Sequence, residues 1–248
     1  GYCNVAKVLA TGKNVKGVEV GDHISTHQSH RSSFRCNQSA VNAVLRNGDD
    51  LVAQSTVYLW HLGYYPLLRA KLAPGSNVLI IGLGALGLTS VAASKNSGCR
   101  VIAMSNRASA RAVAEKFGAE SSYCLKDIRK ARRWMEAQFP DVGVDLVIIT
   151  SNSWNDWRFA LELVRDGGAL AVVGFPGRGL PQAEFNPLDS RYLYDKELTI
   201  YGCGNPPSAD VSVREKRYNL ERNYKYLSEM IRLRRLPARG IVSQVVSW

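Results

Sequence analysis

The chain has 248 residues, of which 46% are hydrophobic and 21% charged. This balance excludes a disordered chain and provides apolar side chains for one large or two modest cores. Lysine and arginine number 32 against 21 acidic residues, so the formal net charge of +11 favours anionic partners such as nucleotide phosphates, acidic substrates, carrier proteins or nucleic acid.

The first part of the chain alternates apolar and polar residues around glycine-rich turns, in "NVAKVLATG" and "KGVEVGDHIST". Such alternation is typical of antiparallel strands with one face in water. The next segment, "LVAQSTVYLWHLGYYPLLRAKLAPG", carries apolar residues at helical spacing and ends at Pro74-Gly75. We therefore expect an antiparallel β-domain and a helix that joins it to a second domain.

From about Asn77 onward, short β-branched apolar runs alternate with amphipathic stretches. The runs are "NVLIIG", "RVIAMS", "DLVIIT", "ALAVVGF" and "LTIYG", and they predict buried parallel strands. Candidate helices between them cover residues 86–95, 109–117, 127–138 and 155–165. This order predicts an α/β fold with a doubly wound Rossmann sheet.

The C-terminal part begins with a second arginine-rich amphipathic helix, expected over residues 213–235, and "GIVSQVVSW" after it is strand-like. We predict three segments. Residues 1–66 form the antiparallel β-domain, residues 67–204 a Rossmann domain, and residues 205–248 a helix that returns to the first domain.

A glycine fingerprint, GxGxxG, lies in "VLIIGLGALGLTS" between a predicted strand and a predicted helix. The first glycine permits the tight turn, the second lets backbone amides approach a pyrophosphate, and the third lets the helix pack on the strand. Without this context the pattern would be only a glycine-rich turn. The residues expected at the pyrophosphate are Gly82, Gly84, Ala85, Leu86 and Gly87.

The end of the second predicted strand, in "RVIAMSNRASAR", bears on the choice of dinucleotide. NAD sites normally place Asp or Glu there to bind the ribose 2′-hydroxyl, whereas this chain has Ser105. Ser105 and Asn106 can donate hydrogen bonds, and Arg107 or Arg111 can add charge-assisted contacts to a 2′-phosphate. We predict NADP(H) as the cofactor. The alternative is that both arginines only decorate an exposed helix start.

Several stretches together resemble the medium-chain dehydrogenase/reductase family, which includes the zinc-type alcohol dehydrogenases. They are "GKNVKGVEVGDHI", "LAPGSNVLIIGLGALG", "RAVAEKFGAES" and "LVRDGGALAVVGFPG". The resemblance implies a Rossmann sheet plus a partial GroES-like antiparallel β catalytic domain. Members of this family are usually longer at both ends, so we expect the sequence to lack the first catalytic strands and the closing C-terminal portion.

The resemblance also places the family's zinc ligands. Where zinc members have Gly-His-Glu this sequence has Gly1, Tyr2 and Cys3, and Tyr58 stands at the acid or cysteine ligand position. The structural lobe of four close cysteines is absent after "GDHI". Because zinc needs three or four N, S or O ligands, we expect no metal. The alternative is a zinc site completed by Cys3, His61 and a ligand from a segment that precedes this sequence.

Three histidines crowd into "GDHISTHQSHRSSF", namely His23, His27 and His30. Exposed turn histidines are the favoured interpretation over a metal site. Residues predicted to be catalytic are His61, Tyr2 and Cys3, although His61 could instead be an ordinary helix histidine. By resemblance, the residues that border the nicotinamide are Ser151, Asn152, Gly174, Phe175 and Pro176.

These features predict a zinc-independent, NADPH-dependent oxidoreductase that transfers hydride to or from a C=O or an activated C=C bond. One alternative is a family member that binds NADPH without catalysis. Another is nucleic-acid binding through "IRKARRW" and "REKRYNLERNYKYLSEMIRLRRLPAR", where solvated helix faces are the favoured interpretation.

Cysteine spacing and hydropathy bear on location. The five cysteines are widely spaced without a CxxC pair, and no apolar run reaches the roughly 18 residues that span a bilayer. We expect a soluble cytoplasmic protein without membrane contact, a small substrate that is acidic or carrier-bound, and a homodimer.

Overall fold

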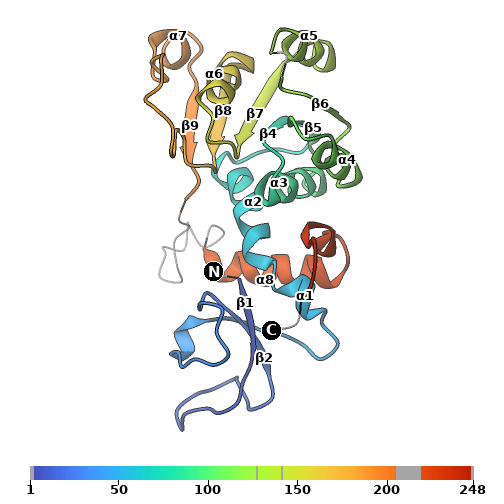
Figure 1. The fold of residues 1–248 in the computed structure, drawn as a ribbon, viewed down its shortest axis with the longest axis vertical. Coiled ribbons are helices and arrows are strands. Elements are labelled where there is room, and N and C mark those ends of the chain that lie inside the picture. The colour runs from blue at the N-terminus through green and yellow to red at the C-terminus, as the bar shows by residue number, and fades with distance from the viewer. Residues whose placement is uncertain (1–2, 127, 141, 205–218, 247–248) are drawn as a thin grey trace. The chain divides into compact units, whose positions relative to one another are not determined.

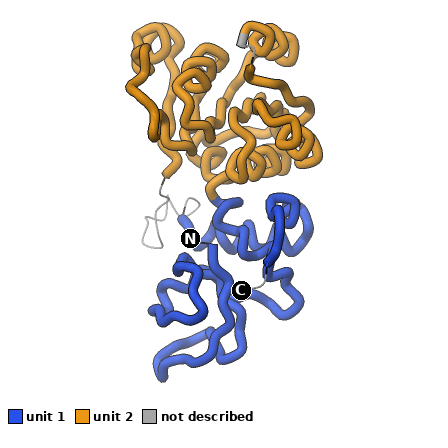
Figure 2. Tube along the Cα trace, viewed as in Figure 1, with its two compact units in different colours: residues 1–61, 206–248 blue, residues 62–205 orange. Residues whose placement is uncertain are grey.

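The structure is a computed structural model that describes residues 3–126, 128–140, 142–204 and 219–246. The chain forms two compact units, shown in Figure 2. Unit 1 comprises Gly1–His61 and Pro206–Trp248, and unit 2 comprises Leu62–Asn205. The domain boundaries predicted from the sequence lie after residues 66 and 204, whereas the units of the structure divide after residues 61 and 205. The division between the units falls inside one helix, α2 (Val57–Arg69), which carries the chain from unit 1 into unit 2.

Unit 2 is built on a six-stranded sheet whose neighbouring strands are all parallel (Figure 1). The strand order is β6-β5-β4-β7-β8-β9, the order of a doubly wound dinucleotide-binding sheet. The strands are β4 (Asn77–Ile81), β5 (Arg100–Met104), β6 (Ser121–Tyr123), β7 (Val144–Ile149), β8 (Val164–Val172) and β9 (Thr199–Gly202). The predicted Rossmann fold is confirmed.

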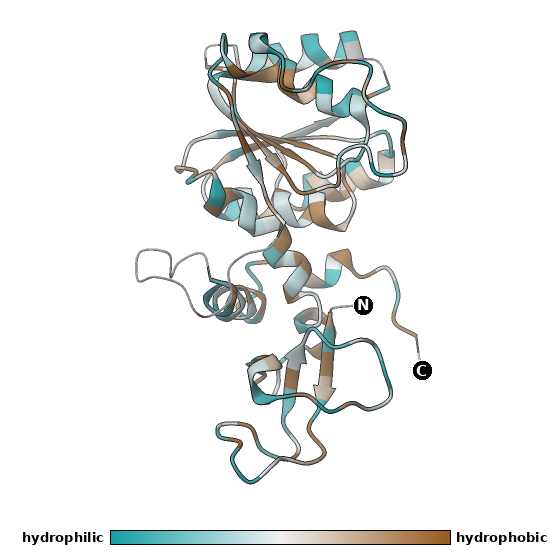
Figure 3. Cartoon of the chain, turned by 90° about the vertical axis from the view of Figure 1, so that its left-hand side faces the viewer, coloured by the Kyte–Doolittle hydropathy of each residue, from teal (hydrophilic) through white to brown (hydrophobic). Residues whose placement is uncertain are grey.

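The sequence pattern found five of these strands because each contains an apolar run. All five residues of β4 are buried, and so are all but one of β7, which explains their continuous apolar runs. Figure 3 shows the strands of unit 2 coloured as mostly hydrophobic. The pattern missed β6, because "SSY" is only three residues long and has no apolar run.

The helices of unit 2 begin and end near their predicted positions. They are α3 (Ala85–Asn96), α4 (Ala108–Lys116), α5 (Ile128–Gln138) and α6 (Trp154–Leu163). A further short helix, α7 (Ser190–Leu193), was not predicted. Helix α6 ends earlier than predicted because Val164 already pairs with Val144 in the sheet. The Lys196 ammonium group donates to the carbonyls of Leu161 and Val164 and so satisfies orphan acceptors at that helix end.

Unit 1 contains a three-stranded antiparallel sheet in the order β1-β2-β3. Its elements are β1 (Asn4–Lys7), β2 (His23–Thr26), η1 (Gln38–Ala40), β3 (Val41–Val44), α1 (Leu51–Gln54), the start of α2, α8 (Leu220–Arg232) and η3 (Ala238–Ile241). The predicted antiparallel strands are confirmed. The predicted joining helix is divided into α1 and α2.

Of the two elements predicted for the C-terminal part, the helix is present as α8 and the strand is absent from the described residues. Asn219 caps α8 by accepting from the Arg222 N–H group at 2.8 Å, and residues 213–218 of the prediction lie outside the described residues. The strand predicted in "GIVSQVVSW" is wrong for the described part, since residues 242–246 form no strand. None of β1, β2 and β3 pairs with residues 242–246. Without a neighbouring strand, the backbone groups of this segment have no partners with which to form a sheet.

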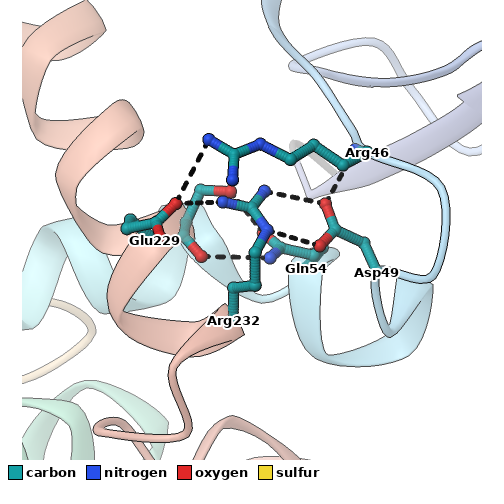
Figure 4. A network of polar contacts seen from close by, with 6 residues as sticks. Arg46, Asp49, Gln54, Glu229 and Arg232 are labelled. Atoms are coloured by element: carbon teal, nitrogen blue, oxygen red, sulfur yellow. Dashed lines mark hydrogen bonds and ion pairs between the residues drawn. The ribbon is translucent and has the colours of Figure 1, made fainter.

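A polar network fixes α8 against residues 46–54 within unit 1 (Figure 4). The Arg232 guanidinium binds both carboxylate oxygens of Asp49, at 2.7 and 2.9 Å, and the Asp49 side chain is only 2% exposed. The hydrogen bond from Arg232 lowers the pKa of Asp49 below its ordinary value. Gln54 and Ser228 exchange two further hydrogen bonds. Removing Arg232 would therefore leave the nearly buried Asp49 carboxylate without its ion-pair partner, whereas Arg232 also pairs with Glu229.

Candidate functional site

The glycine loop of unit 2 has three glycines with three different environments. Gly82 follows β4 with φ +91°, and a Cβ there would lie 2.7 Å from the Thr150 hydroxyl. A Cβ on Gly87 would lie 1.8 Å from the Gly82 carbonyl oxygen, so α3 packs too closely on the loop for any side chain. Gly84 caps α3, and a Cβ there would meet nothing within 4 Å. The space beside Gly84 and the free amides at the α3 N-terminus suit an anionic pyrophosphate.

Thr150 holds this loop from the neighbouring strand, and no local sequence signal marks it for this role. Its hydroxyl donates to the Gly82 carbonyl at 2.8 Å. Thr150 directly follows β7, which lies beside β4 on the side opposite β5. The strand order therefore reverses direction at β4, and open α/β sheets bind ligands outside the carboxyl ends of the strands at this point.

Ser105 stands at the end of β5 and is 7% exposed. Its hydroxyl accepts from the Arg107 backbone N–H at 3.2 Å, and the Arg111 guanidinium donates to its carbonyl at 2.7 Å. The Arg107 guanidinium donates to the Leu83 carbonyl in the glycine loop at 3.0 Å. Two cations and one hydroxyl thus lie beside the loop, and Arg107 is exposed at the start of α4. Asn106 is exposed beside them, near the Cys124 thiol.

The residues predicted to border the nicotinamide lie in the loops after β7 and β8. The Asn152 side chain donates to the Arg178 carbonyl, and the Gly177 N–H donates to the Asn152 carbonyl, both at 2.9 Å. These bonds join the two loops. Gly174 is packed against the Thr150 carbonyl, Phe175 is 67% exposed, Pro176 is exposed, and Ser151 accepts from the Ser153 N–H. Their roles toward a cofactor remain predictions.

In unit 1, five side chains with titratable groups form what we call the aromatic cluster: Cys3, His27, Tyr58, His61 and Tyr224. The ring centroids of His27 and Tyr58 are 4.7 Å apart, and the His61 ring stacks on Tyr224 at 6.3 Å. His27 Nε2 and the Tyr224 hydroxyl are hydrogen-bonded at 2.6 Å. Side chains from the residue before β1, the end of β2, α2 and α8 thus meet in one place.

Burial disfavours the charged forms of four members of the aromatic cluster. It lowers the pKa of His61, which has no exposed surface, to about 4, with repulsion by His27 as a second cause. It also lowers the pKa of His27 and raises the pKa of the Cys3 thiol and of the Tyr224 phenol. Desolvation penalises the charged form in every case. The cluster therefore offers neutral hydrogen-bonding groups.

The predicted catalytic residues are divided between described and undescribed parts of the chain. His61 and Cys3 belong to the aromatic cluster of unit 1, whereas Tyr2 lies outside the described residues. All predicted cofactor residues belong to unit 2. Sequence reasoning missed the pairing of His27 with Tyr224, because these residues are 197 positions apart and no local pattern links them.

The three crowded histidines have separate surroundings. His23 lies in β2 and is half-buried, which differs from the expected exposed turn. His27 belongs to the aromatic cluster, and exposed His30 is hydrogen-bonded to the Cys3 carbonyl at 2.9 Å. Across residues 3–126, 128–140, 142–204 and 219–246, no group of three or more His, Cys, Asp or Glu side chains could hold a metal ion. The described residues therefore do not fit a zinc ion, which needs three or four N, S or O ligands.

Comparisons with known proteins agree with this geometry. The profile of the zinc-binding dehydrogenases matches residues 85–212. The chain belongs to this family, among the medium-chain, alcohol dehydrogenase-like proteins. Sorbitol dehydrogenase of Bacillus subtilis is 34% identical over 142 residues, which are 57% of this chain and 38% of that protein. Alcohol dehydrogenase 2 of Solanum tuberosum is 34% identical over 156 residues, which are 61% of this chain and 40% of that protein. The chain thus spans about two fifths of the length of these relatives.

Solved structures show the same fold at lower identity. Galactitol-1-phosphate dehydrogenase of Escherichia coli matches with a TM-score of 0.76 and 17% identity, over 95% of this chain and 73% of that one. A quinone oxidoreductase of Pseudomonas syringae matches with a TM-score of 0.72 and 17% identity, over 94% and 70%. The predicted α/β fold with its second antiparallel sheet is confirmed. Among the described residues, no helix is long and apolar enough to cross a membrane.

Proposed function

We propose that this protein is a zinc-independent, NADPH-dependent oxidoreductase that transfers hydride to or from a C=O or activated C=C bond of a small or carrier-bound substrate. The observation that carries the proposal is the arrangement at the end of β5. A serine hydroxyl and the guanidinium groups of Arg107 and Arg111 gather there, beside the glycine loop.

This arrangement suits a 2′-phosphate better than a 2′-hydroxyl. A phosphate monoester carries about −1.5 to −2 charges near pH 7 and presents several strong acceptor oxygens. Arginine offers a planar fork of donors that matches phosphate geometry. A carboxylate at position 105 would repel the phosphate, whereas the Ser105 hydroxyl can donate to it. The bound nicotinamide would supply the hydride.

The aromatic cluster supports a reaction without metal. Hydride transfer to a carbonyl or conjugated carbonyl needs a hydrogen-bond donor to stabilise the developing oxyanion. Neutral imidazole, thiol and phenol groups can provide it, and His61, Tyr2 and Cys3 are the residues predicted to act there. Relatives named for sorbitol and alcohols, and a structural neighbour named as a quinone oxidoreductase, support this range of substrate groups.

The proposed assembly is a homodimer. Large apolar side chains are exposed in the segment that precedes edge strand β9, where Leu188 is 61% exposed and Tyr194 is 82% exposed. Exposed apolar side chains beside an open sheet edge favour association. Light scattering of the purified protein should give twice the chain mass.

Cofactor selectivity tests the first part of the proposal. Arg107→Ala and Arg111→Ala should each weaken NADPH binding by about 10- to 150-fold, the value of one charge-assisted hydrogen bond of about 1.5–3 kcal/mol. NADH affinity should change by less than about threefold, because NADH has no 2′-phosphate. Lys116→Ala is the matched control, since it removes one exposed positive charge from the other end of α4. Equal affinities of the wild type for NADPH and NADH in calorimetry would contradict the proposal.

Turnover tests the second part. NADP⁺ would be combined with sorbitol or benzyl alcohol, and NADPH with benzaldehyde, but-2-enal or 1,4-benzoquinone, while absorbance of the reduced cofactor is followed. We expect at least one of these probes to react at a rate unaffected by chelators. Binding of NADPH without turnover of any probe would instead favour a protein that binds cofactor without catalysis.

A further inference from the structure

The hydrogen-bonded pair of His27 and Tyr224 is the part of unit 1 that the predicted catalytic residues leave unused. The two side chains come from the end of β2 and from α8. We propose that His27 exchanges the substrate's proton during hydride transfer, and that Tyr224 positions the His27 ring for this exchange. This inference rests on the proposed oxidoreductase function.

Geometry fixes the His27 ring from two sides. Its Nε2 atom is hydrogen-bonded to the Tyr224 hydroxyl at 2.6 Å, and the Tyr58 ring meets it edge-on at a centroid distance of 4.7 Å. Among the described residues, no hydrogen bond is made by Nδ1 of His27. The ring is thus held through one nitrogen while the other stays available, the arrangement that orients catalytic imidazoles.

Accessibility separates His27 from His61 and Tyr224, whereas Cys3 and Tyr58 are half-buried like His27. His61 has no exposed surface and Tyr224 is only 2% exposed, whereas the His27 side chain is half-buried. A side chain that contacts a substrate must have solvent-exposed surface. His27 can therefore reach a substrate directly, and an imidazole, unlike a thiol or a phenol, ordinarily exchanges protons near neutral pH.

The proton and electron balance is simple when His27 is the base. In alcohol oxidation, the O–H proton would move to His27 Nδ1, and a nicotinamide cofactor held by the glycine loop would accept the C–H hydrogen with its electron pair as hydride. The products are the carbonyl compound, NADPH and the His27 imidazolium, whose Nε2–H donates to the Tyr224 hydroxyl oxygen. Solvent then takes the proton from the half-exposed ring. Carbonyl reduction is the reverse.

The surroundings of His27 predict how the rate depends on pH. The titratable groups that face the pair are Tyr58 and His61 on α2, Tyr224 on α8, and Cys3 near Tyr224. Burial lowers the pKa of His27 below its ordinary value of 6.5, so His27 is a neutral base at pH 7. Oxidation should therefore slow as the pH falls through this pKa, and reduction should slow as the pH rises through it.

Substitution of both partners tests the inference with the full chain and the probe that the wild type turns over. His27→Asn and, as a second variant, His27→Gln should lower kcat by about 100- to 10,000-fold, the range for loss of acid–base catalysis, and should abolish the pH step. The Kd of NADPH, measured in the same preparations, should stay within about threefold and so report a folded protein. His23→Gln is the matched control, because this histidine lies in β2 outside the cluster.

Tyr224→Phe distinguishes positioning from packing. It removes the oxygen that stabilises the imidazolium, so kcat should fall by about tenfold, KM should change little, and the midpoint of the pH profile should move to lower pH. An unchanged midpoint would mean that Tyr224 only fills space, which would overturn its role.

The outcomes separate this inference from the proposed function. If the wild type turns over a probe and both His27 variants keep its rate, the inference is wrong while the oxidoreductase function stands. If His61→Ala lowers kcat and the His27 variants do not, the proton passes through His61 instead. If the wild type binds NADPH and turns over no probe, the oxidoreductase function fails, and the inference fails with it.

Discussion

Gly84→Ala and Gly87→Ala form a matched pair that separates cofactor binding from folding. At Gly84 the backbone φ is −79° and a Cβ meets nothing within 4 Å, so alanine is tolerated by the fold. Alanine is a poorer helix N-cap than glycine, which costs about 1 kcal/mol at most. At Gly87 a Cβ would lie 1.8 Å from the Gly82 carbonyl oxygen. The loop or α3 must then move, at a cost of about 3 kcal/mol or more.

The expected readouts therefore differ in kind. Gly84→Ala should leave Tm within about 4 °C of the wild type, whereas Gly87→Ala should lower it by about 6–12 °C. The methyl group on residue 84 occupies the space in which a pyrophosphate would approach the α3 amides. Loss of one hydrogen bond to a charged group weakens binding by about 10- to 150-fold, and the loss should be equal for NADPH and NADH, because both contain the pyrophosphate.

Thermal unfolding and cofactor fluorescence titration measure these two effects in the same samples. Undiminished affinity of Gly84→Ala for both cofactors would refute the assignment of this loop to a dinucleotide. A large drop in Tm for Gly84→Ala would instead contradict the conclusion that the fold has room for a Cβ at residue 84.

Three further outcomes are expected. Ser105→Asp should weaken NADPH binding and strengthen NADH binding until the preference inverts, as calorimetry with both cofactors would show. Metal analysis of the purified protein should find far less than one zinc per chain, and about one zinc with activity lost on chelation would contradict this expectation. Asp49→Asn should lower the free energy of unfolding by about 2–3 kcal/mol at pH 7, because the Arg232 charge loses its nearly buried partner. Since the folded pKa of Asp49 is lowered, its contribution is fully present above about pH 4 and is lost as the pH falls through the folded pKa, so urea denaturation should show the two proteins converging in acid. Asp50→Asn, at an exposed ion pair with Arg239, should change stability by less than about 1 kcal/mol.

Elements with local signals could be predicted from the amino-acid sequence. The strands β4, β5 and β7 were predictable because their near-complete burial demands continuous apolar runs. The strands β8 and β9 were predictable from the apolar runs "ALAVVGF" and "LTIYG". The glycine loop was predictable because a tight turn and a close helix leave no room for side chains, as Gly82 and Gly87 show. The place of Ser105 directly after a strand was predictable because it follows from chain order. In each case the constraint acts within about 20 residues of chain.

Contacts between distant side chains became known only from the folded chain. No sequence pattern indicates that Thr150 holds Gly82, that Arg107 reaches Leu83, or that His27 and Tyr224 pair across 197 positions. Such contacts depend on how elements pack, and packing is set by the whole core rather than by any local period. The sequence also does not indicate the charge state of His61. Its pKa of about 4 results from the burial of its ring, and burial is a property of the folded chain.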